Sequence, residues 1–86
     1  MPLRDDSGFE AWYRGLHPRL ITALFAASGE LDASQDAADE AFLRALERWP
    51  RVRDMASPEG WTYKVALNAL RGALVESDEH TEVDHA

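Results

Sequence analysis

Apolar residues recur at helical spacing in three stretches of the chain, and none of these stretches shows the strict alternation typical of strands. In residues 9–25 the spacing places them on one side of an α-helix. These residues are Phe9, Trp12, Tyr13, Leu16, Leu20, Leu24 and Phe25. Ser7 with Glu10 predicts a capping box at the start of this helix, and Gly29 predicts its end.

The dipeptide His17-Pro18 interrupts the first stretch. Proline lacks a backbone donor and disfavours helical geometry at the residue before it. We therefore expect a kink or a short break at this point.

The second stretch predicts a helix that starts near Asp32 or Ser34, both good N-caps, and ends at Pro50. Its apolar stripe is rich in alanine, which allows a neighbouring helix to approach closely. The stripe consists of Ala38, Ala41, Phe42, Ala45, Leu46 and Trp49.

A basic loop over residues 50–57 leads into the third stretch. Ser57 is the expected N-cap and Pro58 the expected first helical residue. The residues that can line one side of this helix are Trp61, Val65, Ala66, Leu70, Ala73 and Leu74. Residues 76–86 have high charge and no apolar periodicity, so we expect a disordered tail.

The chain therefore predicts one all-α domain, a compact bundle over residues 9–75, preceded by a leader over residues 1–8. The bundle has three helices, or four if the first breaks at His17-Pro18. A chain of 86 residues can form only one modest core. No cysteine is present, which excludes disulfides and zinc fingers.

The sequence contains neither a secretory signal nor a run long enough to span a membrane. The N-terminus is polar and acidic, unlike a secretory signal. No apolar run approaches the about 20 residues needed to span a bilayer. We expect a soluble, cytoplasmic protein with no membrane partner.

The net charge of −7 argues at first sight against a nucleic-acid partner. Its distribution changes this picture. Residues 41–73 hold six of the nine Lys and Arg residues, residues 1–40 hold eight of the 16 acids, and the stretch from Leu74 holds five acids without a base. Because phosphate neutralisation supplies most non-specific affinity, the chain should bind DNA weakly alone, but it can add contacts inside a larger complex.

Residues for catalysis or metal binding are not arranged in a usable pattern. His17, His80 and His85 lack the spacing of metal ligands, and neither a phosphate loop nor a nucleophile motif is present. Neighbouring acids such as Asp39 and Glu40 point about 100° apart on a helix, so they cannot face each other as an acid and base. We expect no enzyme activity, no cofactor and no metal.

Two stretches resemble the second conserved region of extracytoplasmic-function sigma factors, the compact branch of the bacterial sigma-70 family. They are SQDAADEAFLRALERW (34–49) and, after the basic loop, PEGWTYKVALNALR (58–71). Residues 9–20 are similar to the first helix of the same family. The resemblance covers roughly residues 9–74 and implies the sigma region 2 type of helical bundle.

The resemblance implies that the second helix docks on the clamp helices of the RNA polymerase β′ subunit. The matching positions are Asp36, Asp39, Glu40, Leu43 and Glu47. Their spacing places them on one stripe opposite the apolar stripe. Without the resemblance, an ordinary solvated acidic face would be the simpler interpretation.

The resemblance also implies that the loop and third helix open the minus-ten promoter element and capture a flipped base of the non-template strand. The matching DNA-binding positions are Arg51, Val52, Arg53, Lys64, Asn68 and Arg71. The cations would meet phosphates, and the Asn68 amide can both donate to and accept from a base. Asn68 also fits an ordinary exposed helix position. An anti-sigma factor is a further implied partner.

The sequence departs from the family pattern at several points. Family members often carry larger aliphatic residues at Ala37 and Ala38 and glutamine at Asp39. They usually continue after the third helix with more Lys and Arg. The helix-turn-helix domain that reads the minus-thirty-five element has no counterpart in these residues.

These departures keep an alternative open: a helical interaction module, either a decoy or an anti-sigma-binding fragment, without promoter activity. The acidic total and the acidic tail favour it modestly. A self-sufficient helix-turn-helix repressor fits less well, because a long loop replaces the tight turn before a recognition helix.

Overall fold

The computed structural model describes residues 8–75 with their side chains, and follows the backbone of the last helix to His85. It contains α1 (Phe9–Ser28), α2 (Leu31–Glu47), the short α3 (Trp49–Val52) and α4 (Pro58–His85). No strand occurs in this part of the chain. The predicted all-α fold is confirmed.

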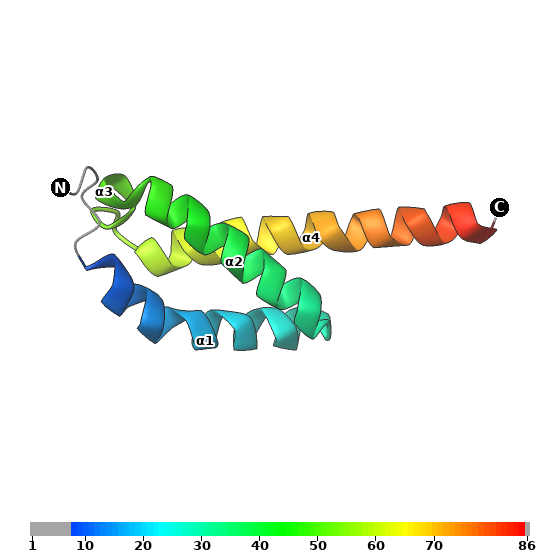
Figure 1. Ribbon diagram of the computed structural model, residues 1–86, viewed down its shortest axis with the longest axis horizontal. Helices are drawn as coiled ribbons and strands as arrows, with labels where there is room; N and C mark the ends of the chain where they lie inside the picture. The colour runs from blue at the N-terminus through cyan, green and yellow to red at the C-terminus, as the bar shows by residue number, and fades with distance from the viewer. Residues whose placement is uncertain (1–7, 86) are drawn as a thin grey trace.

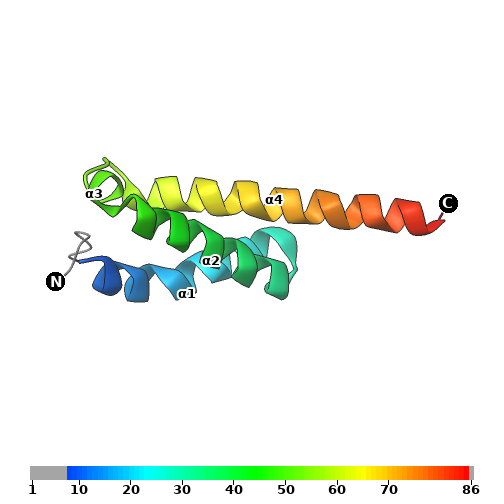
Figure 2. The same ribbon diagram turned by 45° about the horizontal axis from the view of Figure 1, so that its top comes forward.

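Helix α2 lies between α1 and α4 and packs against both, whereas α1 and α4 contact each other less (Figures 1 and 2). Its buried side consists mainly of alanines: Ala37, Ala38, Ala41 and Ala45. Small side chains let the neighbouring backbones approach closely. The alanine-rich stripe therefore forms the centre of the bundle.

The core has two parts. The larger part joins Leu16, Leu20 and Leu24 of α1 to the alanines and Phe42 of α2 and to Ala66 and Leu70 of α4. The smaller part, at the α3 end, consists of Ala45, Trp49 and Val52, with Phe9, Trp12, Met55 and Trp61 packed against it. Two apolar clusters thus cover both ends of α2.

The expected break at His17-Pro18 is wrong, because α1 runs through Pro18 without interruption. Leu16, Leu20 and Leu24 are buried on both sides of the proline. Their packing keeps the helix continuous across Pro18, although the proline cannot donate a backbone hydrogen bond. The Thr22 hydroxyl donates to the Pro18 carbonyl at 2.9 Å.

The end of α1 agrees with the prediction. Gly29 adopts a left-handed conformation, with φ 73°, and its N–H donates to the Phe25 carbonyl. The start cannot be compared fully, because Ser7 of the predicted capping box lies outside the described residues. Glu10 instead pairs with Arg14 at 2.7 Å.

Helix α2 begins at Leu31, so the predicted N-caps Asp32 and Ser34 lie inside it. Ser34 is buried, and its hydroxyl donates to the Glu30 carbonyl at 2.7 Å. The Ser28 hydroxyl lies 3.2 Å from that of Ser34. These contacts join the end of α1 to the first turn of α2, and they explain why the buried Ser34 is not an N-cap.

The expected loop over residues 50–57 is partly helical. Helix α2 ends at Glu47, and Pro50 lies in the first turn of α3, a position that tolerates proline. Ser57 accepts a hydrogen bond from the Gly60 N–H at 3.0 Å, as expected for the N-cap of α4. Residues 76–85, where the sequence predicts a disordered tail, continue the helical backbone of α4, and their side chains lie outside the described residues.

Candidate functional surfaces

Helix α2 carries the five predicted polymerase-binding residues on its exposed side. We call them the acidic face: Asp36, Asp39, Glu40, Leu43 and Glu47. Leu43 is 56% exposed, although it is a large apolar residue. The helix thus has two sides, one buried and rich in alanine, the other charged with a leucine at its centre.

A shallow hollow of about 210 Å³ opens beside Leu43. Its walls come from both α1 and α2, and Asp39 is its one charged lining residue. The lining residues are Phe9, Tyr13, Asp39, Phe42, Leu43 and Leu46. The apolar part of the acidic face therefore continues onto α1.

Two members of the acidic face have partners within the domain. Glu40 Oε2 lies 2.7 Å from Arg44 Nη2, one helical turn further along α2. Asp39 Oδ1 lies 3.4 Å from His17 Nε2 of α1. The remaining acids of the face leave its net charge negative.

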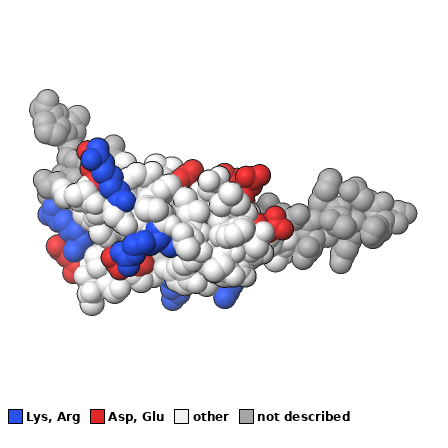
Figure 3. Space-filling view, turned by 90° about the horizontal axis from the view of Figure 1, so that it is seen from below, with Lys and Arg blue, Asp and Glu red and all other residues white. Residues whose placement is uncertain are grey.

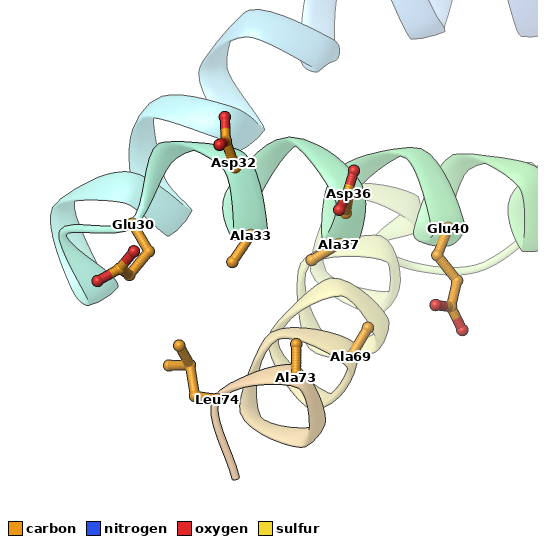
Figure 4. A pocket seen from close by; sticks show the side chains of 9 residues that line it. All are labelled: Glu30, Asp32, Ala33, Asp36, Ala37, Glu40, Ala69, Ala73 and Leu74. Atoms are coloured by element: carbon orange, nitrogen blue, oxygen red, sulfur yellow. The ribbon is translucent and has the colours of Figure 1, made fainter. Parts of the chain in front are cut away.

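A groove of about 470 Å³ separates the first half of α2 from the middle of α4 (Figure 4). Its floor consists of Ala33, Ala37, Ala69 and Ala73, with Leu74 at one side. Its rim carries only acidic charge, from Glu30, Asp32, Asp36 and Glu40. The negative surface of α2 is therefore wider than the five predicted residues, and Glu30 and Asp32 extend it at the N-terminal end.

The predicted DNA-binding residues lie on α3, the loop after it and α4. Arg51, Lys64, Asn68 and Arg71 are exposed. The last three are spaced four and three residues apart, on the side of α4 opposite buried Ala66. The structure thus places one amide and two cations on a single outer strip of α4.

Two members of this predicted set differ from the rest. Val52 is fully buried in the cluster with Ala45 and Trp49, so its side chain supports the loop from inside the domain. Arg53 is exposed, and its Nε lies 3.8 Å from the Asp54 carboxylate. The exposed cations of the predicted set are therefore Arg51, Arg53 beside Asp54, and Lys64 and Arg71 of α4.

A second hollow, of about 240 Å³, joins the two surfaces. It is lined by Glu40 and Arg44 of α2 and by Val65, Asn68 and Ala69 of α4. Sequence reasoning gave Arg44 no role. The only signal for it was the spacing of Glu40 and Arg44, which predicts an ion pair along a helix.

Figure 3 shows how charge is distributed over one face of the domain. Lys and Arg side chains lie over the larger part, toward the α3 end, and are interspersed with acids. The described surface next to the grey end of α4 carries acidic side chains.

The described residues hold no cluster of three or more His, Cys, Asp or Glu side chains that could hold a metal ion. Among the same residues, none of the helices combines the length and the apolar character needed to cross a membrane.

Comparison with known families matches residues 7–77 to the family described as Sigma-70 region 2. The match includes α1, α2, α3 and most of the described part of α4. Comparison with curated proteins and with solved structures gave no match.

Proposed function

The chain belongs to the sigma-70 region 2 family, whose members bind RNA polymerase and recognise promoters, and we propose that it is the region 2 domain of an extracytoplasmic-function sigma factor. In this role it docks on the β′ clamp helices and recognises and opens the minus-ten promoter element. The role needs no catalytic residue, because nucleotide addition belongs to the polymerase.

The acidic face of α2 is the observation that carries the proposal. Leu43 is 56% exposed and adjoins the hollow lined by apolar side chains of α1 and α2, so the exposed apolar surface here is a contiguous patch and not a single side chain. An apolar centre ringed by charge is the usual organisation of a protein interface. The acids attract a basic partner helix, and Leu43 with its neighbouring hollow supplies the apolar contact.

The outer strip of α4 supports the promoter half of the proposal. Lys64 and Arg71 can neutralise phosphates of an opened strand, and Asn68 between them can read the edge of an extruded base. The low positive charge of the domain agrees with a protein that contacts DNA only when polymerase holds it in place. Such a domain acts in the cytoplasm, and an anti-sigma factor that covers the acidic face would silence it.

Binding to the isolated clamp-helix fragment of β′ tests the docking half. The variant pair Glu40→Lys with Leu43→Ala should weaken binding at least about tenfold, because it removes the central apolar contact and reverses one charge. The matched control is Glu10→Lys with Leu31→Ala. Glu10 also pairs with an arginine at 2.7 Å, and Leu31 is 48% exposed, but neither belongs to the acidic face.

Equal loss in both double variants would contradict docking through the acidic face. No binding by the wild-type domain, shown to be folded by circular dichroism, would contradict the docking proposal altogether.

The alternative, an interaction module without promoter activity, is favoured by two observations on charge. The groove between α2 and α4 has an entirely acidic rim, and the whole chain carries −7. Reversing the charge of Arg51, Arg53 and Lys64 distinguishes the two roles. If the chain is a sigma domain, this variant should no longer support transcription by core polymerase. If the chain is an interaction module, the wild type should support no transcription, and the variant should keep its affinity for the protein partner.

A further inference from the structure

Arg44 projects from α2 into the same hollow as Asn68 of α4. The hollow holds about 240 Å³, and the rest of its lining is Glu40, Val65 and Ala69. Arg44 is 52% exposed, so its guanidinium is accessible to a ligand in this space. A cation beside an amide is a suitable pair for the phosphate and base of one nucleotide.

Glu40 limits what Arg44 can do in the free domain. The Glu40 carboxylate lies 2.7 Å from the guanidinium and lines the same hollow. It neutralises the arginine and repels a phosphate that approaches it. Glu40 also belongs to the acidic face, so one carboxylate serves two surfaces.

We propose that Arg44 is a DNA-backbone contact whose availability depends on polymerase docking. When a basic side chain of the polymerase engages Glu40, the carboxylate releases Arg44. The guanidinium then turns to a phosphate of the strand held at Asn68. This inference rests on the proposed docking through the acidic face, and it adds a direct link from that face to the DNA surface.

Thermodynamic linkage makes the effect reciprocal, so a bound strand should also strengthen polymerase binding by the same factor. The factor is small. Exposed ion pairs are weak, so release of Arg44 should raise DNA affinity by about two- to fivefold. The coupling therefore favours binding of polymerase and DNA together by a small factor, and it does not act as an all-or-none switch.

The pair Glu10–Arg14 on α1 supplies a matched control. It has the same spacing and the same 2.7 Å distance, with both side chains 75% exposed. Neither residue lines any of the hollows that contain Asn68 or Leu43. Any effect of charge alone should therefore appear equally in both pairs.

The first arm of the test needs no polymerase. Affinity of the full chain for a short fluorescent oligothymidylate is measured at low salt for Glu40→Gln and for Glu10→Gln. Glu40→Gln should raise the affinity by about two- to fivefold more than Glu10→Gln does. The gain should vanish when Arg44→Gln is added.

The second arm adds a saturating amount of the clamp-helix fragment. The wild type should then bind the oligothymidylate more tightly, and Arg44→Gln should abolish that gain. The slope of log affinity against log salt should fall by about 0.7 in Arg44→Gln, as expected for the loss of one single-strand phosphate contact. Arg14→Gln should leave the slope unchanged.

Equal effects of the α1 and α2 variants in the first arm would overturn the proposal. A clamp-helix fragment that fails to bind the wild type would overturn docking through the acidic face, while the first arm would still decide whether Glu40 restrains Arg44. The variants lie on exposed helix positions, and circular dichroism verifies that each stays folded.

Discussion

His17 Nε2 lies 3.4 Å from Asp39 Oδ1 and links α1 to the acidic face of α2. The imidazole also packs against two aromatic rings, with centroid distances of 4.9 Å to Tyr13 and 5.6 Å to Phe42. Asp39 is 67% exposed at its side chain, whereas His17 is 27% exposed. Packing against Tyr13 and Phe42 therefore fixes the His17 ring. The fixed ring in turn restricts the position of the Asp39 carboxylate.

The weak polar link between His17 and Asp39 should contribute little to folding. In a double-mutant cycle with His17→Phe and Asp39→Asn, we expect a coupling energy below about 1 kcal/mol, because the pair is long and partly solvated. Urea unfolding of the four proteins, followed by circular dichroism, measures it. A coupling energy well above this value would mean that the pair is a structural element of the fold.

Gly29 and Gly15 should respond in opposite ways to alanine. Gly29 ends α1 with φ 73°, so Gly29→Ala should lower the free energy of unfolding by about 1 kcal/mol. Gly15 lies inside α1, and a methyl group there meets nothing within 4 Å. Gly15→Ala should raise the free energy of unfolding by about 0.5–1 kcal/mol. The same sign for both changes would contradict the conformational explanation.

Ser57 and Gly60 should be coupled at the start of α4. Ser57→Ala removes the acceptor for the Gly60 N–H and should cost about 1 kcal/mol. A Cβ at Gly60 would lie 2.8 Å from the Ser57 hydroxyl, so Gly60→Ala displaces the cap and loses most of the gain in helix propensity. Without the Ser57 hydroxyl, Gly60→Ala should stabilise the domain by up to about 1 kcal/mol. Thermal unfolding of the single and double variants gives the comparison, and strict additivity would contradict it.

Asn68 should matter for promoter DNA and little for stability. It is exposed on the outer strip of α4, so Asn68→Ala should change the free energy of unfolding by less than about 0.5 kcal/mol. It should lower transcription from a cognate promoter with core polymerase, while binding to the clamp-helix fragment stays unchanged. Gln35→Ala, which removes an exposed amide from α2, is the control. Equal transcription by both variants would argue against base recognition by Asn68.

Local rules determined much of this fold from the sequence alone. The three long helices follow from apolar spacing, the end of α1 follows from the freedom of Gly29 to adopt positive φ, and the start of α4 follows from Ser57 and Pro58. The acidic face could be predicted for the same reason. Residues three and four positions apart share a side of any helix, whatever it packs against.

Contacts between distant segments decided the rest. Buried leucines on both sides of Pro18 keep α1 continuous through the proline, and α2 starts at Leu31, before the serine whose hydroxyl contacts Ser28. Burial of Val52 turns a predicted DNA contact inward. Local sequence does not show which residues become buried. It also does not show that packing between helices compensates for the hydrogen bond that a proline removes.

The relation between the two functional surfaces also required the tertiary structure. Glu40 and Arg44 are paired by helical spacing, but their proximity to Asn68 depends on how closely α4 approaches α2. The buried alanines at positions 38, 41 and 45 set that distance. The sequence by itself determined which residues share a helix side, and the packing of α4 on the alanine stripe decided which of them share a hollow.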